Sequence, residues 1–455
     1  MKAKLFLASL PQAAFSAKQV LGNEAKVANK ENIDMYSLMT SAGEAVFQHL
    51  QQYYLSNINI ESKESARQAV FVICGKGNNG GDGFIVAALA AKQGLQVTVL
   101  LTVSPNELSG DALRAYQYCF GIKEAASTSL TFEQPSRMVE IITAFQGTVI
   151  VDAIFGIGFK GSLPQSITEV VNAINKHPAK VVSVDVPSGL CATTGYVENS
   201  AVEANSTVTF IAMKSGLVTG QAINHVGNLY FAELAIGHAF SHQVKSELSL
   251  LGSSILSELP TRAPNSHKGD IGLLMAIGGD RGFAGAIRLS AEAALRSGSA
   301  LVSVCCHQSN QALVFIGRPE LMLAPSFAKE LASTNAFNKA KVYVLGPGLG
   351  QNDWGLALFH SVISQNKISV IDADGLRLLA KGYHQGLLTE SVKDNDWILT
   401  PHPGEAAALL NCTVADIERD RFSAVKIIAQ QYNCVCLLKG AGSLVSDGKH
   451  VWINT

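Results

Sequence analysis

A segment dense in glycine, asparagine and aspartate stands out in the first hundred residues. Residues 75–83 read GKGNNGGDG, with five glycines in nine positions. Glycine lets a backbone approach a ligand closely, and Asn78 and Asn79 offer amide donors and acceptors that carry no charge. The GxGxxG pattern of dinucleotide-binding proteins is formally present. However, Asp82 places a carboxylate where a pyrophosphate needs amide donors, and no acidic residue follows the next apolar run. We therefore predict a small-molecule site of another kind, the alternative being a plain glycine-rich turn.

Two other segments in the same half place an aspartate directly after an apolar run. They are VDAIFGIGFKG (151–161) and VDVPSG (184–189), with Asp152 and Asp185 as their acidic residues. Carboxylate, amide and hydroxyl oxygens around one point suit a hard cation, and the neutral ligands among them favour weak monovalent binding. The alternative is that each aspartate caps the following turn or helix through free backbone amides.

The second half carries a series of comparable loops. In order they read HKGDIG (267–272), GGDRGFAGA (278–286), GPGLG (346–350), DADG (372–375), PHPGE (401–405) and KGAGS (439–443). Glycine-rich turns before helices bind phosphate or sugar through backbone amides, and no Walker A sequence is present. Taken singly, His402 could be a turn residue, Asp372 and Asp374 could be caps, and Lys439 could be a solvated side chain. Taken together, these loops predict one nucleotide site.

The elements that must position these segments are strands buried on both faces. Apolar runs without alternation are typical of parallel sheets covered by helices. We predict strands at 69–74, 97–101, 148–151, 181–184, 272–277, 301–306, 342–345, 369–371, 397–399 and 435–438, and helices at 40–50, 84–93 and 286–297. The fold class is therefore α/β, beginning with a doubly wound sheet. Ligands bind beyond the carboxyl ends of such strands, where the loops above lie.

Length and composition limit the remaining possibilities. A chain of 455 residues is longer than one hydrophobic core usually supports. Near residue 240 the sequence becomes rich in serine and leucine, which predicts domains at 1–240 and 241–455. With 35 basic and 36 acidic residues, neither nucleic acid nor a membrane surface is an expected partner. The eight cysteines form no CxxC pair, and no apolar stretch reaches membrane-spanning length. We therefore predict a soluble, cytoplasmic protein that binds small molecules.

The three segments of the first half resemble the signature segments of NAD(P)H-hydrate epimerase domains. GNNGGDG (77–83), VDAIFGIGFKG and VDVPSG carry this resemblance, which runs over about residues 5–235 and implies a Rossmann-like fold. It implies a potassium ion held by Asn79, Asp152 and Ser188, and substrate contact by Asp185. Residues implied to bind the hydrated cofactor are Asn78, Asn79, Gly80, Gly81, Asp82, Gly156, Ile157, Gly158, Phe159, Lys160, Gly161 and Ser162.

Epimerisation at the carbon that took up hydroxide requires proton transfer, for which a buried carboxylate is suited. We therefore predict that Asp185 is the acid–base group, and that Lys160 is a second catalytic candidate through contact with phosphate or substrate.

The loops of the second half resemble ADP-dependent NAD(P)H-hydrate dehydratase domains, which have a ribokinase-like fold. The resemblance covers about residues 245–455, with the motifs in family order. It implies that ADP donates phosphate to the hydroxyl that leaves, with Mg²⁺ as a further candidate cofactor. Implied contacts to the hydrated cofactor are Ala286, Gly348, Gly350 and His402. Implied contacts to the adenine nucleotide are Lys439, Gly440, Ala441, Gly442 and Ser443.

This family continues with a GGxGD segment that supplies nucleotide contacts and the general base. The sequence ends at Thr455 without one. We therefore expect the dehydratase domain to be incomplete at its C-terminus and unable to complete dehydration.

The leading hypothesis is thus a bifunctional enzyme that repairs hydrated NADH and NADPH, as a monomer or a homo-oligomer. A ribokinase-like small-molecule kinase with an accessory ligand-binding domain is the first alternative. A binding module without turnover is the second, because related domains can bind ligands without catalysis.

Overall fold

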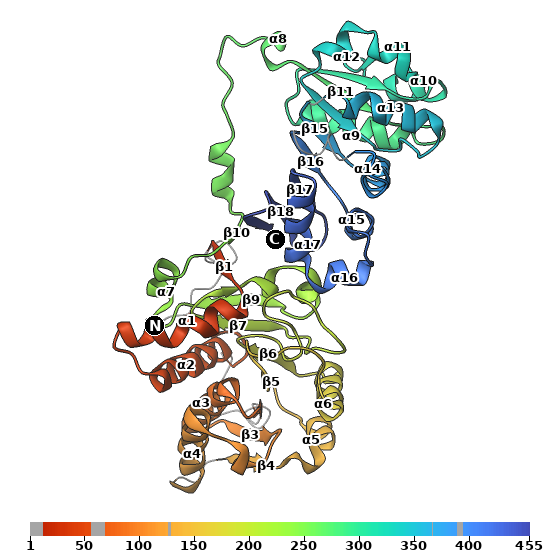
Figure 1. Ribbon diagram of the computed structural model, residues 1–455. Helices are drawn as coiled ribbons and strands as arrows, with labels where there is room; N and C mark the ends of the chain where they lie inside the picture. Colours follow the sequence, from red (N-terminus) through yellow and green to blue (C-terminus); the bar gives the residue numbers. More distant parts are fainter. Residues whose placement is uncertain (1–11, 56–68, 126–128, 366, 389–394) are drawn as a thin grey trace. The chain divides into compact units, whose positions relative to one another are not determined.

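The computed structural model describes residues 12–55, 69–125, 129–365, 367–388 and 395–455. The chain forms two compact units, Met1–Gly252 together with Thr455, and Ser253–Asn454 (Figure 1). Each has its own sheet and core and is described separately below. Among the described residues, no helix combines the length and apolarity that crossing a bilayer requires.

The first unit is built on a parallel sheet, which confirms the predicted α/β class. Its described strands lie in the order β4-β3-β2-β5-β6-β7-β9, and all neighbouring pairs are parallel. Their bounds are β2 Ala69–Cys74, β3 Gln96–Leu101, β4 Leu130–Glu133, β5 Val149–Ala153, β6 Lys180–Val184, β7 Ser206–Phe210 and β9 Asn228–Ala232. The order reverses between β2 and β5, which are the neighbours that carry the glycine-rich segment and Asp152. Such a switch point opens a crevice for ligands.

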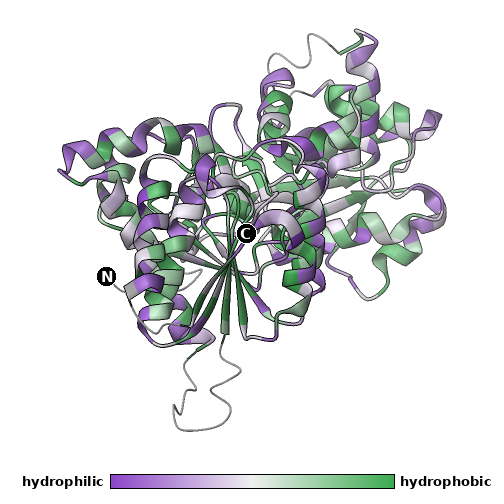
Figure 2. Cartoon of the chain, turned by 90° about the horizontal axis from the view of Figure 1, so that it is seen from below, coloured by the Kyte–Doolittle hydropathy of each residue, from purple (hydrophilic) through white to green (hydrophobic). Residues whose placement is uncertain are grey.

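Apolar side chains on both faces of the sheet explain its helical layers. In β2, Val70 and Val72 pack toward one core cluster, whereas Phe71 and Ile73 pack toward another. The strands are accordingly green in Figure 2, the colour of hydrophobic residues. The helices that contribute to the first cluster are α1 (Ala17–Lys30), α2 (Met35–Tyr53), α3 (Asn78–Lys92), α4 (Gly110–Ala125) and α7 (Gly237–Gln243). The helices that contribute to the second are α5 (Met138–Ala144) and α6 (Gln165–Lys176).

Two predictions about helices in this unit need correction. The helix expected at 84–93 begins at Asn78, so most of the glycine-rich segment is the first turn and a half of α3 rather than a turn before it. Three glycines in the helical part of the segment, Gly80, Gly81 and Gly83, concealed this start, because glycine disfavours helix in isolation. The helix expected at 40–50 extends over Met35–Tyr53, with Asp34 accepting a hydrogen bond from the Ser37 amide as its N-cap.

A small set of strands completes the first unit. β1 (Ala13–Phe15) pairs antiparallel with β10 (Leu248–Leu250) and parallel with β8 (Met213–Lys214). β10 therefore belongs to the first unit, although it follows the change in amino-acid composition near residue 240.

The second unit contains a sheet with described strands in the order β13-β12-β11-β14-β15-β16-β17-β18-β19. The strands from β13 to β17 are parallel to one another, and β18 and β19 turn back antiparallel. Bounds are β11 Leu273–Ile277, β12 Leu301–Cys305, β13 Met322–Leu323, β14 Val342–Leu345, β15 Ser369–Ile371, β16 Trp397–Leu399, β17 Val435–Leu438, β18 Ser443–Ser446 and β19 Val451–Asn454. Every predicted strand of this half is present, within one residue at each end.

Helices connect these strands in the manner of βαβ units. They are α8 Lys268–Ile271, α9 Ala284–Arg296, α10 Gln311–Phe315, α11 Ala328–Ala332, α12 Asn335–Lys339, α13 Asp353–Ile363, α14 Asp374–His384, α15 Pro403–Leu410, α16 Val414–Arg419 and α17 Arg421–Gln431. Because the strands from β11 to β17 run parallel, the loops after them meet at one edge of the sheet.

Candidate active sites

A cavity of about 600 Å³ lies at the carboxyl ends of β2, β5 and β6 in the first unit. Residues from α1, α2, β8 and the loop after β5 complete its wall. The predicted site residues that line it are Asn78, Asn79, Asp82, Gly156, Ile157, Gly158, Phe159, Lys160 and Asp185. The structure thus brings the three signature segments around one space, as the parallel strand ends require.

Of the residues predicted to bind the hydrated cofactor, four lie outside the lining of this cavity, namely Gly80, Gly81, Gly161 and Ser162. The first two are needed for packing. A Cβ atom on Gly80 would lie 2.0 Å from the carbonyl oxygen of Gly75, and one on Gly81 would lie 2.6 Å from the sulfur of Met39. These glycines let α3 begin immediately against its own loop and against α2.

The chemical centre of the cavity is an ion pair between Asp185 and Lys214. The Lys214 ammonium donates to Asp185 Oδ1, to Thr209 Oγ1 at 3.0 Å and to the carbonyl of Phe210 at 2.8 Å. Asp185 and Lys214 are only 7% and 2% exposed. A buried ammonium with three acceptors is fully satisfied, and its charge compensates that of the carboxylate beside it.

Asp185 also has an unusual backbone conformation. Its φ is 63°, in the left-handed region that aspartate tolerates better than most residues. The Asp185 amide donates to the carbonyl of Val208 at 2.8 Å, which fixes the turn after β6. Local strain of this kind is concentrated at functional sites.

Sequence reasoning missed Lys214. It directly follows the apolar run FIAM (210–213), where a charged residue is unusual. That charge was the available signal, but only the burial and hydrogen bonds of Lys214 in the folded chain show that its side chain points inward.

Two further carboxyls belong to this cavity, Asp82 on α3 and Glu24 on α1. Burial raises the pKa of Asp82 well above its usual value, and the charges of Asp185 and Glu24 add to the rise, while Lys214 opposes it. Burial also raises the pKa of Glu24, against the lowering influence of Lys214. The cavity therefore raises the pKa of two carboxyls that lie beside the Asp185–Lys214 ion pair.

Asp152 lies beside the cavity in a closed hydrogen-bond network. Its carboxylate accepts from Ser183 Oγ at 2.8 Å, from the Ser188 amide at 2.9 Å and from Ser188 Oγ at 2.5 Å, as well as from the Ile154 amide at 3.3 Å. Burial raises the pKa of Asp152, and these four hydrogen bonds lower it. The segments 151–155 and 184–189 are thereby joined.

Asn79 contributes an unsatisfied group near the same place. Its Nδ2 atom is buried without a hydrogen-bond partner, and its Oδ1 lies 2.9 Å from where a Cβ on Gly156 would be. Carboxamide nitrogen and oxygen have similar shapes, so the amide can turn to present an acceptor here. No group of three or more His, Cys, Asp or Glu side chains within the described ranges is placed to hold a metal. A cation at this place would depend on neutral oxygens.

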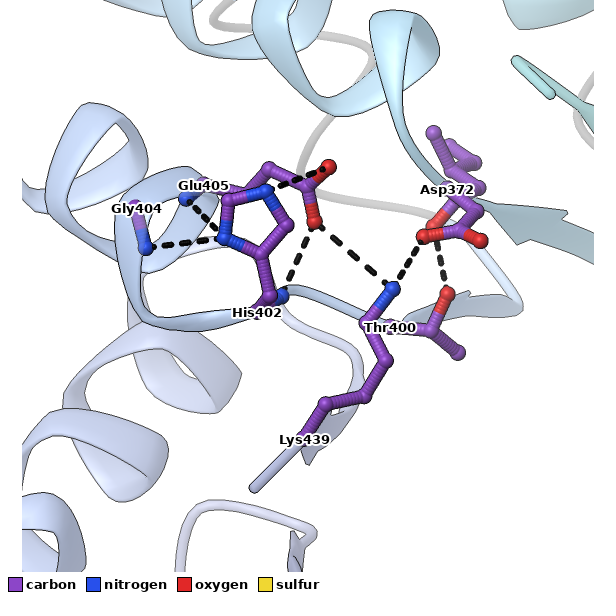
Figure 3. A network of polar contacts seen from close by, with 7 residues as sticks. Asp372, Thr400, His402, Gly404, Glu405 and Lys439 are labelled. Atoms are coloured by element: carbon purple, nitrogen blue, oxygen red, sulfur yellow. Dashed lines mark hydrogen bonds and ion pairs between the residues drawn. The ribbon is translucent and has the colours of Figure 1, made fainter. Parts of the chain in front are cut away.

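The loops of the second unit meet in a polar network shown in Figure 3. Lys439 Nζ lies 2.8 Å from Asp372 Oδ1 and 3.8 Å from Glu405 Oε2. Glu405 accepts from the His402 amide at 2.9 Å, and its other oxygen lies 3.3 Å from His402 Nε2. The Thr400 hydroxyl donates to the carbonyl of Ile371 at 3.3 Å. Loops after β15, β16 and β17 therefore share one centre.

Two further predicted loops, 278–286 and 346–350, meet at the first turn of α9. A Cβ on Gly348 would lie 2.7 Å from Cβ of Phe283 and 3.4 Å from Cβ of Ala286, which places these predicted residues together. A Cβ on Gly350 would lie 2.9 Å from Asp280 Oδ2. The Gly350 amide donates to Asp374 Oδ2 at 2.9 Å, which connects this cluster to the loop of Asp372.

The turn between β17 and β18 contains the predicted nucleotide residues Lys439–Ser443, and a buried arginine supports it. Arg421, 1% exposed, donates to the carbonyl of Lys439 at 3.2 Å and pairs with Glu418 at 3.1 Å. Gly440 has a φ of 142°, and a Cβ there would lie 2.7 Å from Arg421 Nη2. Sequence reasoning missed Arg421, which lies in no strand-end loop, and it gave no role to Glu405, the last residue of PHPGE (401–405).

Two protein families match separate parts of the chain. Residues 35–216 match the family described as YjeF-related protein N-terminus, and residues 274–455 match NAD(P)H-hydrate dehydratase. Among solved structures, an ADP/ATP-dependent NAD(P)H-hydrate dehydratase from Bacillus subtilis shares 26% identity, covering 43% of this chain and 68% of that one, with a TM-score of 0.38. A ribokinase-like protein from Enterococcus faecalis shares 24% identity, covering 46% and 72%, with a TM-score of 0.41.

The matches among curated proteins extend over nearly the whole chain. The bifunctional NAD(P)H-hydrate repair enzyme of Escherichia coli is 38% identical over 96% of this chain and 79% of its own length. That of Coxiella burnetii is 39% identical over 93% and 81%. These matches cover both units, which supports the repair-enzyme hypothesis over the kinase alternative. The chain belongs to the family of bifunctional NAD(P)H-hydrate repair enzymes.

Proposed function

We propose that domain 1–240 interconverts the R and S forms of hydrated NADH and NADPH, and that domain 241–455 removes the added water with ADP. The observation that carries the first assignment is the buried Asp185–Lys214 pair in a cavity at the switch point of the sheet. A buried carboxylate paired with a lysine is suited to accept a proton from substrate or water. The eight cysteines are free thiols, which supports a reducing, cytoplasmic location.

The hydrated cofactor would occupy the cavity described above. Asn78, Asn79 and Asp82 contribute polar groups at the start of α3, and residues 156–160 form the opposite loop. Lys160 is exposed at the rim, where an ammonium would contact a phosphate of the cofactor. In this arrangement Asp185 acts on the reacting carbon, and Lys160 binds rather than transfers a proton.

A potassium ion is proposed at Asn79, Asp152 and Ser188. One carboxylate together with amide and hydroxyl oxygens is a donor set for a weakly bound monovalent cation. The Nδ2 position of Asn79 is buried without a hydrogen-bond partner. Turning the carboxamide would put its oxygen at that position, where a cation would satisfy it, and this supports the proposal. The ion would supply positive charge and order the loop after β5.

In the second unit, Ala286, Gly348, Gly350 and His402 are proposed to contact the hydrated cofactor. Residues Lys439–Ser443 are proposed to hold the phosphates of ADP, with Mg²⁺ accompanying the nucleotide. Positive φ angles at Gly440 and Gly442 leave the backbone of this turn open to a phosphate. The Lys439 ammonium, already between two carboxylates, can exchange one of them for a phosphate oxygen.

Epimerisation is tested by starting from one separated epimer of hydrated NADH, with potassium present, and following formation of the other by chromatography. Asp185→Asn should lower the rate by at least about 100-fold, the usual contribution of a general base. Because this change leaves Lys214 buried without its counter-ion, the Asp185→Asn/Lys214→Met double variant is measured alongside as a folded reference. Exposed Glu44→Gln is the matched control. A folded Asp185→Asn protein with the unmodified rate would overturn the assignment.

Dehydration is followed in the same samples as the return of NADH absorbance on addition of ADP. Recovery of absorbance supports the second assignment. No recovery, with epimerisation intact, would contradict it.

A further inference from the structure

Helix α1 contributes a carboxyl to the cavity that none of the signature segments includes. Glu24 lies in the second half of this helix and lines the cavity together with Val20 and Leu21. Its side chain is half-buried. Among the residues that the structure describes, none forms a hydrogen bond or an ion pair with it. A carboxyl in such a place is available to a ligand.

The charges around Glu24 come from several elements. They are Asp82 on α3, Asp185 after β6, Lys214 on β8, and Lys76 and Lys160 on the two glycine-containing loops. The ammonium of Lys214 is the buried cation among them, and its three hydrogen bonds go to Asp185, Thr209 and Phe210. Glu24 feels that charge without bonding to it, while burial and the Asp185 charge raise its pKa. Glu24 is therefore a carboxyl without a bonded partner, in the same cavity as a carboxylate that is paired with a lysine.

Epimerisation by loss and return of water needs one group that gives a proton and one group that takes a proton. The leaving hydroxyl must receive a proton, and the water that adds to the opposite face of the carbon must lose one. Two carboxyls whose surroundings give them different pKa values commonly serve as the acid and the base of one site. We propose that Glu24 is a second acid–base residue of the epimerase half and works together with Asp185. This inference rests on the proposed function of the first unit.

The atoms balance as follows. Glu24 gives its proton to the hydroxyl oxygen, the carbon–oxygen bond breaks, and the lone pair of the ring nitrogen forms a carbon–nitrogen double bond. Asp185 takes a proton from a water whose oxygen bonds to the other face of that carbon, and the double-bond electrons return to nitrogen. One water leaves and one enters. Glu24 ends ionised and Asp185 protonated, and proton exchange with solvent water restores both groups before the next turnover.

The test is steady-state epimerisation by the full chain, in both directions and across pH, with Glu24→Gln, Glu24→Asp and the exposed control Glu44→Gln. Glu24→Gln should lower kcat by about 100-fold or more, with little change in KM and with loss of one limb of the pH–rate profile. Glu24→Asp should retain that limb and part of the rate. Thermal unfolding establishes that each variant is folded.

Other outcomes overturn the inference in distinguishable ways. Unmodified kcat and pH profile in Glu24→Gln would exclude a role in proton transfer while leaving the proposed function intact. Equal losses in both Glu24 variants with an unchanged pH profile would indicate a structural role. No epimerisation by the unmodified chain would overturn this inference and the proposed function together.

Discussion

At the scale of single residues, the first unit concentrates buried polar groups near β6 and β7. Asp185 and Lys214 neutralise each other there, and Asp152 is satisfied by the residues around Ser188. Buried charges are tolerated only when paired or hydrogen-bonded in this way. Their placement costs stability that the surrounding apolar core must offset, as is usual for a site built for chemistry.

His49 is a buried residue with a different consequence. It is 2% exposed on α2, its Nε2 lies 2.8 Å from Ser206 Oγ, and its Nδ1 has no partner. The rings of Tyr53, Tyr54 and Tyr230 surround it. This burial lowers the pKa of His49 to about 4. Between about pH 4 and 6.5 the folded protein therefore keeps this imidazole neutral, whereas the same side chain in the unfolded chain is protonated.

We predict that His49 makes the first unit sensitive to acid. The folded pKa is depressed, so the unfolded state binds the proton first as pH falls below about 6.5. Stability should therefore decline between about pH 6.5 and 4, by up to about 3 kcal/mol from this residue. Glu and Asp residues titrate in the same window, so the measurement is the difference between wild type and His49→Gln in denaturant unfolding. Exposed His242→Gln should leave the pH dependence unchanged. Parallel pH curves for wild type and His49→Gln would refute the prediction.

At the scale of elements, the start of α3 decides the geometry of the first site. Gly77 is its N-cap without a side-chain hydrogen bond, so the amides of the first turn remain free at the cavity. The sequence predicted a strand, a glycine segment and a helix in the right order. It misplaced the helix start, because close packing rather than propensity determines where α3 begins.

Substitutions of two glycines three residues apart should separate packing from propensity. Gly80→Ala would bring Cβ to 2.0 Å from the Gly75 carbonyl, so the loop must move, and we expect destabilisation of at least about 2 kcal/mol with loss of epimerisation. Gly77→Ala meets nothing within 4 Å at a φ of −93°, so it should change stability by less than about 1 kcal/mol. Thermal unfolding and the epimerase assay measure both. Equal tolerance of the two substitutions would contradict this account of the loop.

At the scale of the whole molecule, two units with separate cores bring two linked reactions into one chain. The first unit has its clusters around β2 and β5, and the second has one around β11 and β12. Each unit places its site at the carboxyl ends of its parallel strands. Their chemistry differs because the loops differ, as is general for α/β folds.

We predict that ADP stabilises the second unit selectively. A ligand at about 100 times its Kd adds about 2.7 kcal/mol to the state that binds it. Calorimetry should then show a transition that moves to higher temperature with ADP and another that does not move. Lys439→Met should abolish the shift, while Lys449→Met on the exposed turn between β18 and β19 should retain it. A shift that survives Lys439→Met would place the nucleotide elsewhere.

The sequence by itself determined the fold class, the parallel strands and the segments that gather at their ends. Strands buried on both faces leave continuous apolar runs, and 69–74 and 342–345 were therefore predicted at the same bounds as β2 and β14. Shorter or more polar strands such as β4 (LTFE) and β7 (STVTF) left no such run and were not predicted. Family resemblance further identified the reactions, through motifs such as GNNGGDG and LLKGAGS.

Only the tertiary structure decided which isolated residues join those motifs. Glu24, Lys214 and Arg421 belong to no motif, and each reaches its site from an element distant in sequence from the residues it meets there. Their roles depend on which way a helix or strand turns its side chains once packed, and local sequence does not encode that. From sequence alone, a lysine at the end of an apolar run could be exposed or buried. Burial requires a carboxylate partner that offsets the cost of burying the charge, and only the fold brings that partner from elsewhere in the chain.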